Sequence, residues 1–263
     1  MHIQIEKPCL GVPISLIVDD SAPCVNPLYY FRLQVNREHD TPHEPCIPLD
    51  FLEQFAAVCQ AHGIRGKFSL LPYPAGLGSI LDGWDGCDRR ELAHWLDLAR
   101  SEIAPRFDIT PEILTHTLAL DLHTHGLLAQ TEHDWLAERT CAEIVEYFSA
   151  ALAILKAAGF APMGITQPCY FDGSRADYTE ATLEAIRTAG GPPVTFYFID
   201  GYFEGPPIPP PEVVLLDRER GEAVVNILDY CDDYFWRTQR PWSQRSEQVP
   251  DLFITAGFPR KPG

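Results

Sequence analysis

The sequence predicts an α/β fold, and more specifically a single-domain, distorted parallel (β/α) barrel of about seven strands. Strand and helix patterns alternate along almost the whole chain, which is typical of βα units joined into a parallel sheet. The chain has 263 residues, a length at which such barrels form one unit. No G-x-G-x-x-G or G-x-x-x-x-G-K motif follows any strand, which favours the barrel over an open nucleotide-binding sheet.

The first half of the chain shows strand runs separated by amphipathic helices. Residues 13–20 (PISLIVDD) form a continuous apolar, β-branched run, typical of a strand buried on both faces. The helix after it stops at Gly63, and Asp88 is a suitable N-cap for the next one. In order, the predicted elements are strand 13–20, helix 48–62, strand 67–71, a helix beginning after Asp88, and strand 113–122.

The second half repeats this alternation. A long helical pattern closes at Gly159, and Asp177-x-x-Glu180 resembles a capping box with Asp as the first residue. No linker or internal repeat interrupts the chain, so residues 1–263 are expected to form one domain. The predicted elements are helix 131–158, strand 164–169, a helix ending at Gly190-Gly191, and strands 194–200, 213–217 and 223–228.

The composition limits which classes of binding partner and which cellular compartment are expected. The chain has 20 Lys and Arg against 37 Asp and Glu, a net charge of -17, which disfavours binding to nucleic acid or to an anionic membrane surface. No export signal or membrane-length apolar run is visible, so a soluble, cytoplasmic protein is expected. The eight cysteines contain no C-x-x-C pair, which argues against a zinc ribbon and for reduced thiols.

The adjacent carboxylates Asp19 and Asp20 are the sharpest chemical feature. They end the first predicted strand, and active sites of α/β proteins gather at the carboxyl ends of strands. Consecutive strand residues point to opposite sides, but at a strand end the chain can turn both towards one opening. One carboxylate could then bind a cation while the other accepts a proton. The alternative is that they cap a turn.

These residues carry a family resemblance. The segment PISLIVDDS, residues 13–21, resembles the first motif of the polysaccharide deacetylase superfamily. The resemblance implies a deacetylase-like barrel in which Asp19 is the catalytic base and Asp20 ligates a divalent metal. Residues 112–117 echo the second motif and imply His116 as a further ligand, and residues 166–170 echo the third.

The sequence departs from that family at three positions. Leu120 stands where the second motif has a second histidine, Gln167 stands where the third motif has arginine, and Asp217 falls near the strand end where the family has a late histidine. His123 and His125 could supply the missing ligand, because alternate residues of an extended segment face the same way and neutral imidazoles bind zinc. They could equally be surface loop residues.

Aromatic and proline residues near these motifs suggest a substrate pocket. Tyr29 follows the aspartates and could line a pocket for a sugar ring, although aromatic clusters are more often core. Pro168 and Tyr170 belong to the segment that echoes the third family motif. We therefore expect Tyr29, Pro168 and Tyr170 to contact the substrate.

Together these features predict a metal-dependent hydrolase. It would remove an acyl group, through an amide or ester bond, from a small carbohydrate-like molecule in the cytoplasm. The expected cofactor is a divalent metal ion, with zinc favoured, and the expected partner is a small-molecule or carbohydrate substrate. Two alternatives remain: a catalytically inactive binding protein on the deacetylase fold, and a metal-independent amidohydrolase. Fold resemblance alone cannot choose among them.

Overall fold

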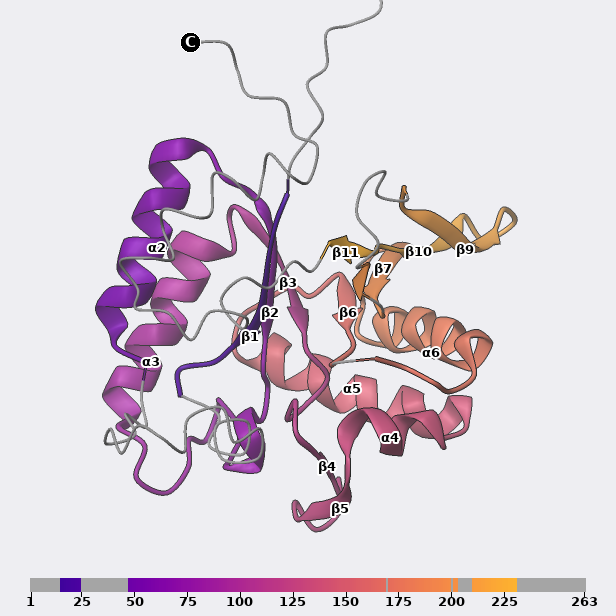
Figure 1. Ribbon diagram of the computed structural model, residues 1–263, viewed down its shortest axis with the longest axis horizontal. Coiled ribbons are helices and arrows are strands. Elements are labelled where there is room, and N and C mark those ends of the chain that lie inside the picture. Colours follow the sequence, from indigo (N-terminus) through magenta and orange to yellow (C-terminus); the bar gives the residue numbers. More distant parts are fainter. Residues whose placement is uncertain (1–14, 25–46, 169, 200, 203–209, 231–263) are drawn as a thin grey trace, which may run out of the picture.

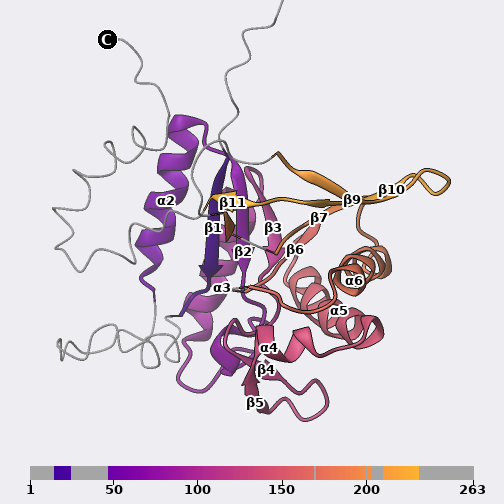
Figure 2. The same cartoon turned by 45° about the vertical axis from the view of Figure 1, so that its right-hand side comes forward.

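The chain contains two groups of strands, each covered by its own helices. The structure is a computed structural model that describes residues 15–24, 47–168, 170–199, 201–202 and 210–230. In the first group, three parallel strands lie in the order β1-β2-β3. Helices α2 and α3 pack beside one another against these strands (Figures 1 and 2). Their bounds are β1 Leu16–Ser21, α2 Leu49–His62, β2 Gly66–Leu70, α3 Arg89–Leu98 and β3 Phe107–Pro111.

The second group is a four-stranded sheet of order β6-β7-β10-β9, in which only β9 runs antiparallel. It is joined to the first group by one parallel bridge between Glu112 and Thr166. Helices α5 and α6 cover it (Figure 1). The bounds are α5 Cys141–Ala157, β6 Gly164–Thr166, α6 Arg175–Thr188, β7 Val194–Phe198, β9 Glu212–Asp217 and β10 Glu222–Asn226.

Shorter elements fill the connections. Strands β4 and β5 pair antiparallel, β8 and β11 pair parallel, and α4 follows β5 directly. A three-residue 3-10 helix, Pro74–Gly76, follows β2, and α3 continues into a π-helical turn, Ala99–Ile103. The bounds are β4 Leu118–Leu120, β5 Leu127–Thr131, α4 Glu132–Ala137, β8 Gly201–Tyr202 and β11 Asp229–Tyr230.

The predicted barrel is wrong. Among the described residues no sheet closes on itself; the architecture is mixed α/β with small sheets. Closure would require a last parallel strand to pair with β1, but the outer edge of β10 pairs with the antiparallel strand β9. The periodicity of residues 213–217 and 223–228 identified two strands there but left their direction open, because a hairpin and a βα unit present the same apolar runs.

Three element predictions also differ from the structure. The predicted strand 113–122 is replaced by β3, which ends at Pro111, and by the short β4. The predicted helix 131–158 is split in two, because Thr140 caps a new helix through a capping box with Glu143. Helix α6 is capped by Ser174 and not by Asp177. The cap at Asp88 is confirmed, since its side chain accepts from the amides of Arg90 and Glu91.

Side-chain alternation gives the first sheet one apolar face and one polar face. Phe68 of β2 and Phe107 of β3 pack with buried residues of α2 and α3. Successive strand residues point to opposite faces, so Lys67, Ser69 and Thr110 lie on the side away from these helices. All three are buried, with side chains at most 3% exposed. A sheet face that buries a charge and hydroxyls must satisfy them internally, and the candidate site does so.

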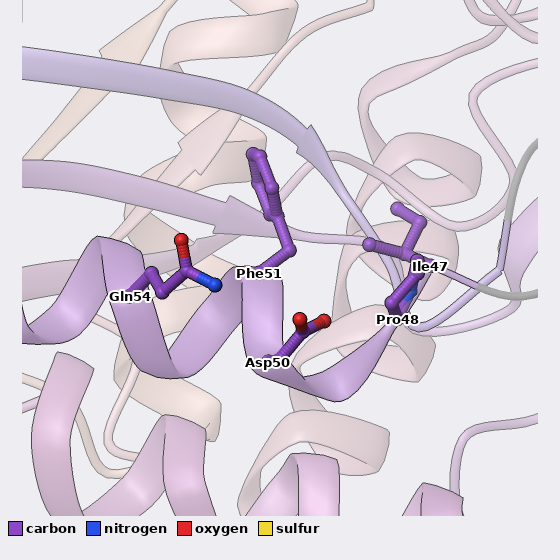
Figure 3. Close-up of a pocket in the computed structure, with 5 residues that line it drawn as sticks. All are labelled: Ile47, Pro48, Asp50, Phe51 and Gln54. Carbon is purple, nitrogen blue, oxygen red and sulfur yellow. The ribbon is translucent and has the colours of Figure 1, made fainter.

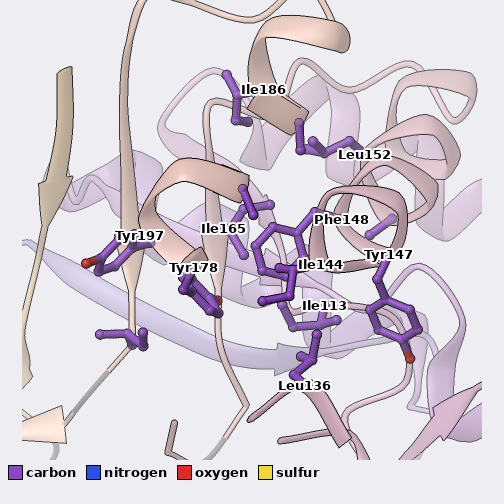
Figure 4. Close-up of a cluster of buried hydrophobic side chains, with 14 of the residues drawn as sticks. Ile113, Leu136, Ile144, Tyr147, Phe148, Leu152, Ile165, Tyr178, Ile186 and Tyr197 are labelled. Atoms are coloured by element: carbon purple, nitrogen blue, oxygen red, sulfur yellow. The ribbon is translucent and has the colours of Figure 1, made fainter. Parts of the chain in front are cut away.

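A second core lies between α5, α6 and the second sheet (Figure 4). Its largest buried side chains include Tyr147, Phe148 and Tyr178, and Phe148 and Tyr178 meet edge to face at 5.0 Å. Helix α5 belongs to both cores, because Leu152 packs in this cluster and Leu155 packs in the cluster under α2 and α3. In the part of the chain that the structure describes, no helix has the length and apolar character to cross a membrane.

Candidate functional site

A β-bulge places Asp19 and Asp20 together at the end of β1. The pairing with β2 is regular up to Val18 opposite Phe68, and then shifts so that Ser21 is opposite Leu70. Two aspartates therefore face the single residue Ser69, and Asp20 takes a left-handed backbone with φ 57°. Bulges re-aim side chains beside active sites. This local distortion lets both carboxylates reach the polar face of the sheet.

Asp19 is held by a buried lysine of the neighbouring strand. The Lys67 ammonium forms an ion pair with the Asp19 carboxylate and donates to Thr166 Oγ1 at 3.2 Å. It also lies 4.6 Å from the ring centre of Phe198, in cation–π contact. The Lys67 side chain is 3% exposed, whereas that of Asp19 is 35% exposed. Asp19 is thus fixed on its protein side and open on the other.

Asp20, Glu112 and His116 form the second half of the site. His116 Nε2 lies 3.0 Å from Asp20 Oδ1, and its Nδ1 lies 3.0 Å from Glu112 Oε1. The other Glu112 oxygen accepts from the Asp20 backbone amide at 2.7 Å and from the Ser69 hydroxyl. One potential ligand atom from each of the three residues lies within 4.8 Å of the others. Glu112 and His116 are buried, while the Asp20 side chain is 45% exposed.

Without a bound metal ion, the formal charges of the cluster do not sum to zero. Three carboxylates face the single ammonium of Lys67, and His116 lies between two of them. Burial alone would lower the pKa of His116, but the charges of Glu112 and Asp20 raise its pKa well above the ordinary value. A protonated His116 still leaves one negative charge. A divalent cation beside a neutral His116 would bring the formal charge to zero.

The two aspartates are tuned in opposite directions. Burial raises the pKa of the Asp19 carboxyl above its ordinary value, and the charge of Glu112 raises it further against the opposing effect of Lys67. For Asp20, burial acts upward too, but the charge of His116 and its contact bring the pKa below the ordinary value. Carboxyl groups whose pKa values diverge in this way suit different roles. Asp19 is the better proton acceptor and Asp20 the better permanent anion.

The structure brings together three of the predicted site residues. Asp19 and Asp20, at the carboxyl end of β1, meet His116, which follows the carboxyl end of β3; these are the two outer strands of the first sheet. His123 and His125 do not join them. They lie in the exposed turn between β4 and β5, where the Asp121 side chain accepts from the backbone amide of His123. The ring of His125 stacks at 6.4 Å on Tyr73.

Two of the three predicted substrate-binding residues, Pro168 and Tyr170, follow β6 in the chain. Pro168 is buried, and its carbonyl and that of Tyr170 accept from the Gln167 side-chain amide at 3.3 Å. Tyr170 is 49% exposed and its ring lies 4.6 Å from the ring of His133. Burial lowers the pKa of His133, and the charge of His116 lowers it further, so Tyr170 contacts, in a tilted arrangement, a residue within electrostatic reach of the site. Tyr29 lies outside the described residues.

Glu112 and Lys67 were not predicted as site residues. The available signal was a polar residue inside a strand pattern. Lys67 and Ser69 alternate with apolar residues in a strand that is buried from Lys67 onward. Glu112 precedes His116 by four residues, but their contact arises in a loop and not on a helix. No sequence pattern indicated that Glu112 would contact the ring of His116.

An open hollow of about 340 Å³ lies apart from these residues, at the beginning of α2. Figure 3 shows the side chains that line it, none of which belongs to the polar cluster. The lining residues are Ile47, Pro48, Asp50, Phe51 and Gln54. The hollow is therefore no part of the candidate site.

No protein-family profile matches the chain, and neither a curated protein nor a solved structure shows significant similarity to it. The resemblance to polysaccharide deacetylases thus remains an expectation from short motifs. The function has to be inferred from the geometry of the site.

Proposed function

We propose that the chain is a metal-dependent hydrolase that removes an acyl group from a small carbohydrate-like molecule. The observation that carries the proposal is the cluster of Asp20, Glu112 and His116, whose ligand atoms lie within 4.8 Å of one another beside a second carboxylate. One imidazole with carboxylates is a ligand set that suits zinc and manganese. The acyl and carbohydrate parts of the proposal rest on the resemblance of residues 13–21 to a deacetylase motif.

Asp20 and His116 are the two residues best placed to hold the ion. Both oxygens of Glu112 already have protein partners, namely His116 Nδ1 on one side and the Asp20 amide with Ser69 on the other. His116 Nε2 and the Asp20 carboxylate face each other, and Asp20 is partly exposed. Carboxylates behind metal-bound histidines fix the tautomer and orientation of the ring. Glu112 would fill that role and keep Nε2 available.

The remaining residues suit the chemistry of acyl hydrolysis. A bound divalent ion supplies a water of lowered pKa and polarises the scissile carbonyl. Asp19 lies next to Asp20 in sequence and has a raised pKa, so its carboxylate can take the proton that the water loses. Lys67 holds that carboxylate in place through the ion pair. Tyr170 offers an exposed ring on which a sugar could stack.

A matched pair of variants tests the proposal. Asp20→Asn removes a ligand, so we expect bound metal to fall at least about 100-fold and hydrolysis to vanish. Asp19→Asn keeps the ligands, so bound metal should persist while the rate falls by about 10²–10⁴. Zinc, manganese and nickel are measured in purified protein by elemental analysis. Acyl release is measured on a panel of N- and O-acetylated sugars, well below the melting temperature of each variant.

A second candidate function is a metal-independent hydrolase at the same site. It is favoured by the position of His116, whose two ring nitrogens each lie 3.0 Å from a carboxylate oxygen. A proton on this ring would then take the place of the cation. Activity that survives a chelator, with no metal in the wild-type protein but with loss in Asp19→Asn, would select this mechanism. A protein with neither metal nor activity would contradict both.

A further inference from the structure

Glu132, the first residue of α4, is a completely buried carboxylate bound by backbone donors. Its side chain is 0% exposed. One oxygen, Oε1, accepts from the amides of Leu114 and Thr115, both at 3.0 Å, and from the Tyr147 hydroxyl at 2.8 Å. The other, Oε2, accepts from the amide of His116 at 2.8 Å. Four donors thus converge on the Glu132 carboxylate. One of them, Tyr147, belongs to the second core and is labelled in Figure 4.

The three amides belong to the loop that carries His116. This loop joins β3 to β4 and includes two residues with left-handed backbone, Ile113 at φ 46° and His116 at φ 58°. A β-branched residue in this region is a genuine outlier, and such strained residues persist only where the surrounding structure enforces their conformation. The loop therefore needs an external restraint. Glu132 supplies it, because three successive amides can reach one carboxylate only in such a tight turn.

The restraint acts directly on the candidate site. The same backbone conformation that gives the His116 amide to Glu132 presents the ring to Asp20 and Glu112 at 3.0 Å. We propose that Glu132, secured by Tyr147, is a positioning residue that holds the strained 114–116 backbone so that His116 reaches Asp20. This role adds to the proposed function. It rests on that function only for the identity of the ligand that His116 binds.

The chemistry of the contacts requires a carboxylate at this position. A carboxylate only accepts hydrogen bonds, at about four lone-pair sites, and all four of these contacts come from donors. A glutamine of the same shape would direct its NH₂ group at an N–H or O–H in either orientation. Each donor left buried without an acceptor carries the full penalty of its desolvation. Glu132→Gln is therefore a nearly isosteric test of the restraint.

The experiment compares Glu132→Gln with Thr182→Ala. Thr182 is also buried, and its hydroxyl donates to the Tyr178 carbonyl on α6. In Glu132→Gln we expect amide hydrogen exchange in the peptide covering 114–116 to accelerate by about 10–100-fold, since a lost buried hydrogen bond has this effect on local opening. We expect zinc affinity, measured by calorimetry, to fall by about 10–100-fold, as for other supporting residues of metal sites. Thr182→Ala should change neither property.

Several outcomes would overturn the proposal. If Glu132→Gln folds and its amide exchange in 114–116 equals that of wild type, Glu132 does not restrain this loop. If Thr182→Ala loses as much zinc affinity as Glu132→Gln, the loss reflects general stability and not positioning of His116. If Glu132→Gln does not fold, Tyr147→Phe serves instead, because it removes one of the four donors and keeps the carboxylate; unchanged exchange there would count against the role. A wild-type protein that binds no zinc contradicts the proposed function, but the exchange measurement still tests Glu132.

Discussion

At the scale of single residues, the polar face of the first sheet depends on paired charges. Lys67, the second residue of β2, is buried, and a buried ammonium is costly unless it has a charged partner and further hydrogen bonds. Asp19 supplies the charge and Thr166 the hydroxyl, which in turn lies 2.8 Å from Thr110 Oγ1. The arrangement joins β1, β2, β3 and β6 through side chains alone.

A double-mutant cycle measures the Asp19–Lys67 pair. Lys67→Met removes the ammonium and leaves Asp19 unpaired, and Asp19→Asn leaves the buried ammonium without its anion. We expect each to destabilise the protein by about 1–3 kcal/mol, less than a fully buried pair because Asp19 is 35% exposed. The double variant should lose less than the two single losses together, with a coupling of at least about 1 kcal/mol. Urea denaturation at fixed pH provides the values.

Purely additive losses in that cycle would show that the ion pair contributes nothing in solution. Ser101→Ala is a suitable control, since its hydroxyl makes only a long contact, 3.5 Å, to the Leu98 carbonyl on an exposed turn. It should lie within about 0.5 kcal/mol of wild type.

At the scale of elements, the site depends on how closely β1 approaches β2. Leu16 is paired with Gly66, and a Cβ atom at Gly66 would lie 1.7 Å from the Leu16 carbonyl oxygen. The backbone contact therefore requires glycine. It also sets the register in which Val18 faces Phe68 and the bulge begins at Asp19. A substitution at Gly66 would therefore also displace the two aspartates at the other end of β1.

Gly66→Ala should separate the two strands. We expect a loss of at least about 2 kcal/mol, because the clash is with backbone and cannot be relieved by a rotamer change. Gly126→Ala is the matched control, since its Cβ would meet only a side-chain oxygen of Thr124 at 3.3 Å. Thermal or urea unfolding of the two variants gives the comparison. Equal stabilities would mean that β1 does not pair with Gly66 as described.

At the scale of the whole molecule, the candidate site links the two groups of strands at a second place, besides helix α5, which packs in both apolar cores. Asp20 lies on β1, which contacts the first core, and His116 lies in a loop whose neighbour Ile113 packs in the second. An ion held by both residues would connect these regions directly. If the ion binds only the folded state, its binding free energy adds to the free energy of unfolding.

Divalent metal should therefore raise the melting temperature. At a free concentration 100-fold above Kd the stabilisation is about 2.7 kcal/mol, or roughly 5–10 °C for a chain of this size. Asp20→Asn should lose this shift, whereas Asp97→Asn should keep it, because Asp97 is 71% exposed and pairs with Arg100 elsewhere. Scanning calorimetry with and without chelator provides the comparison. A wild-type melting temperature indifferent to zinc, manganese and nickel would contradict the metal site.

The α/β class and most of the strands and helices could be predicted from the amino-acid sequence, because alternation and helical periodicity report local burial. The strand pattern located Asp19 and Asp20 at a strand end, and the resemblance of residues 112–117 to a deacetylase motif implied His116. The bulge, the open sheet and the exposed position of His123 and His125 could not be predicted in this way, because they depend on strand pairing. Asp20 and Glu112 are 92 positions apart, and no local pattern encodes a contact that topology creates.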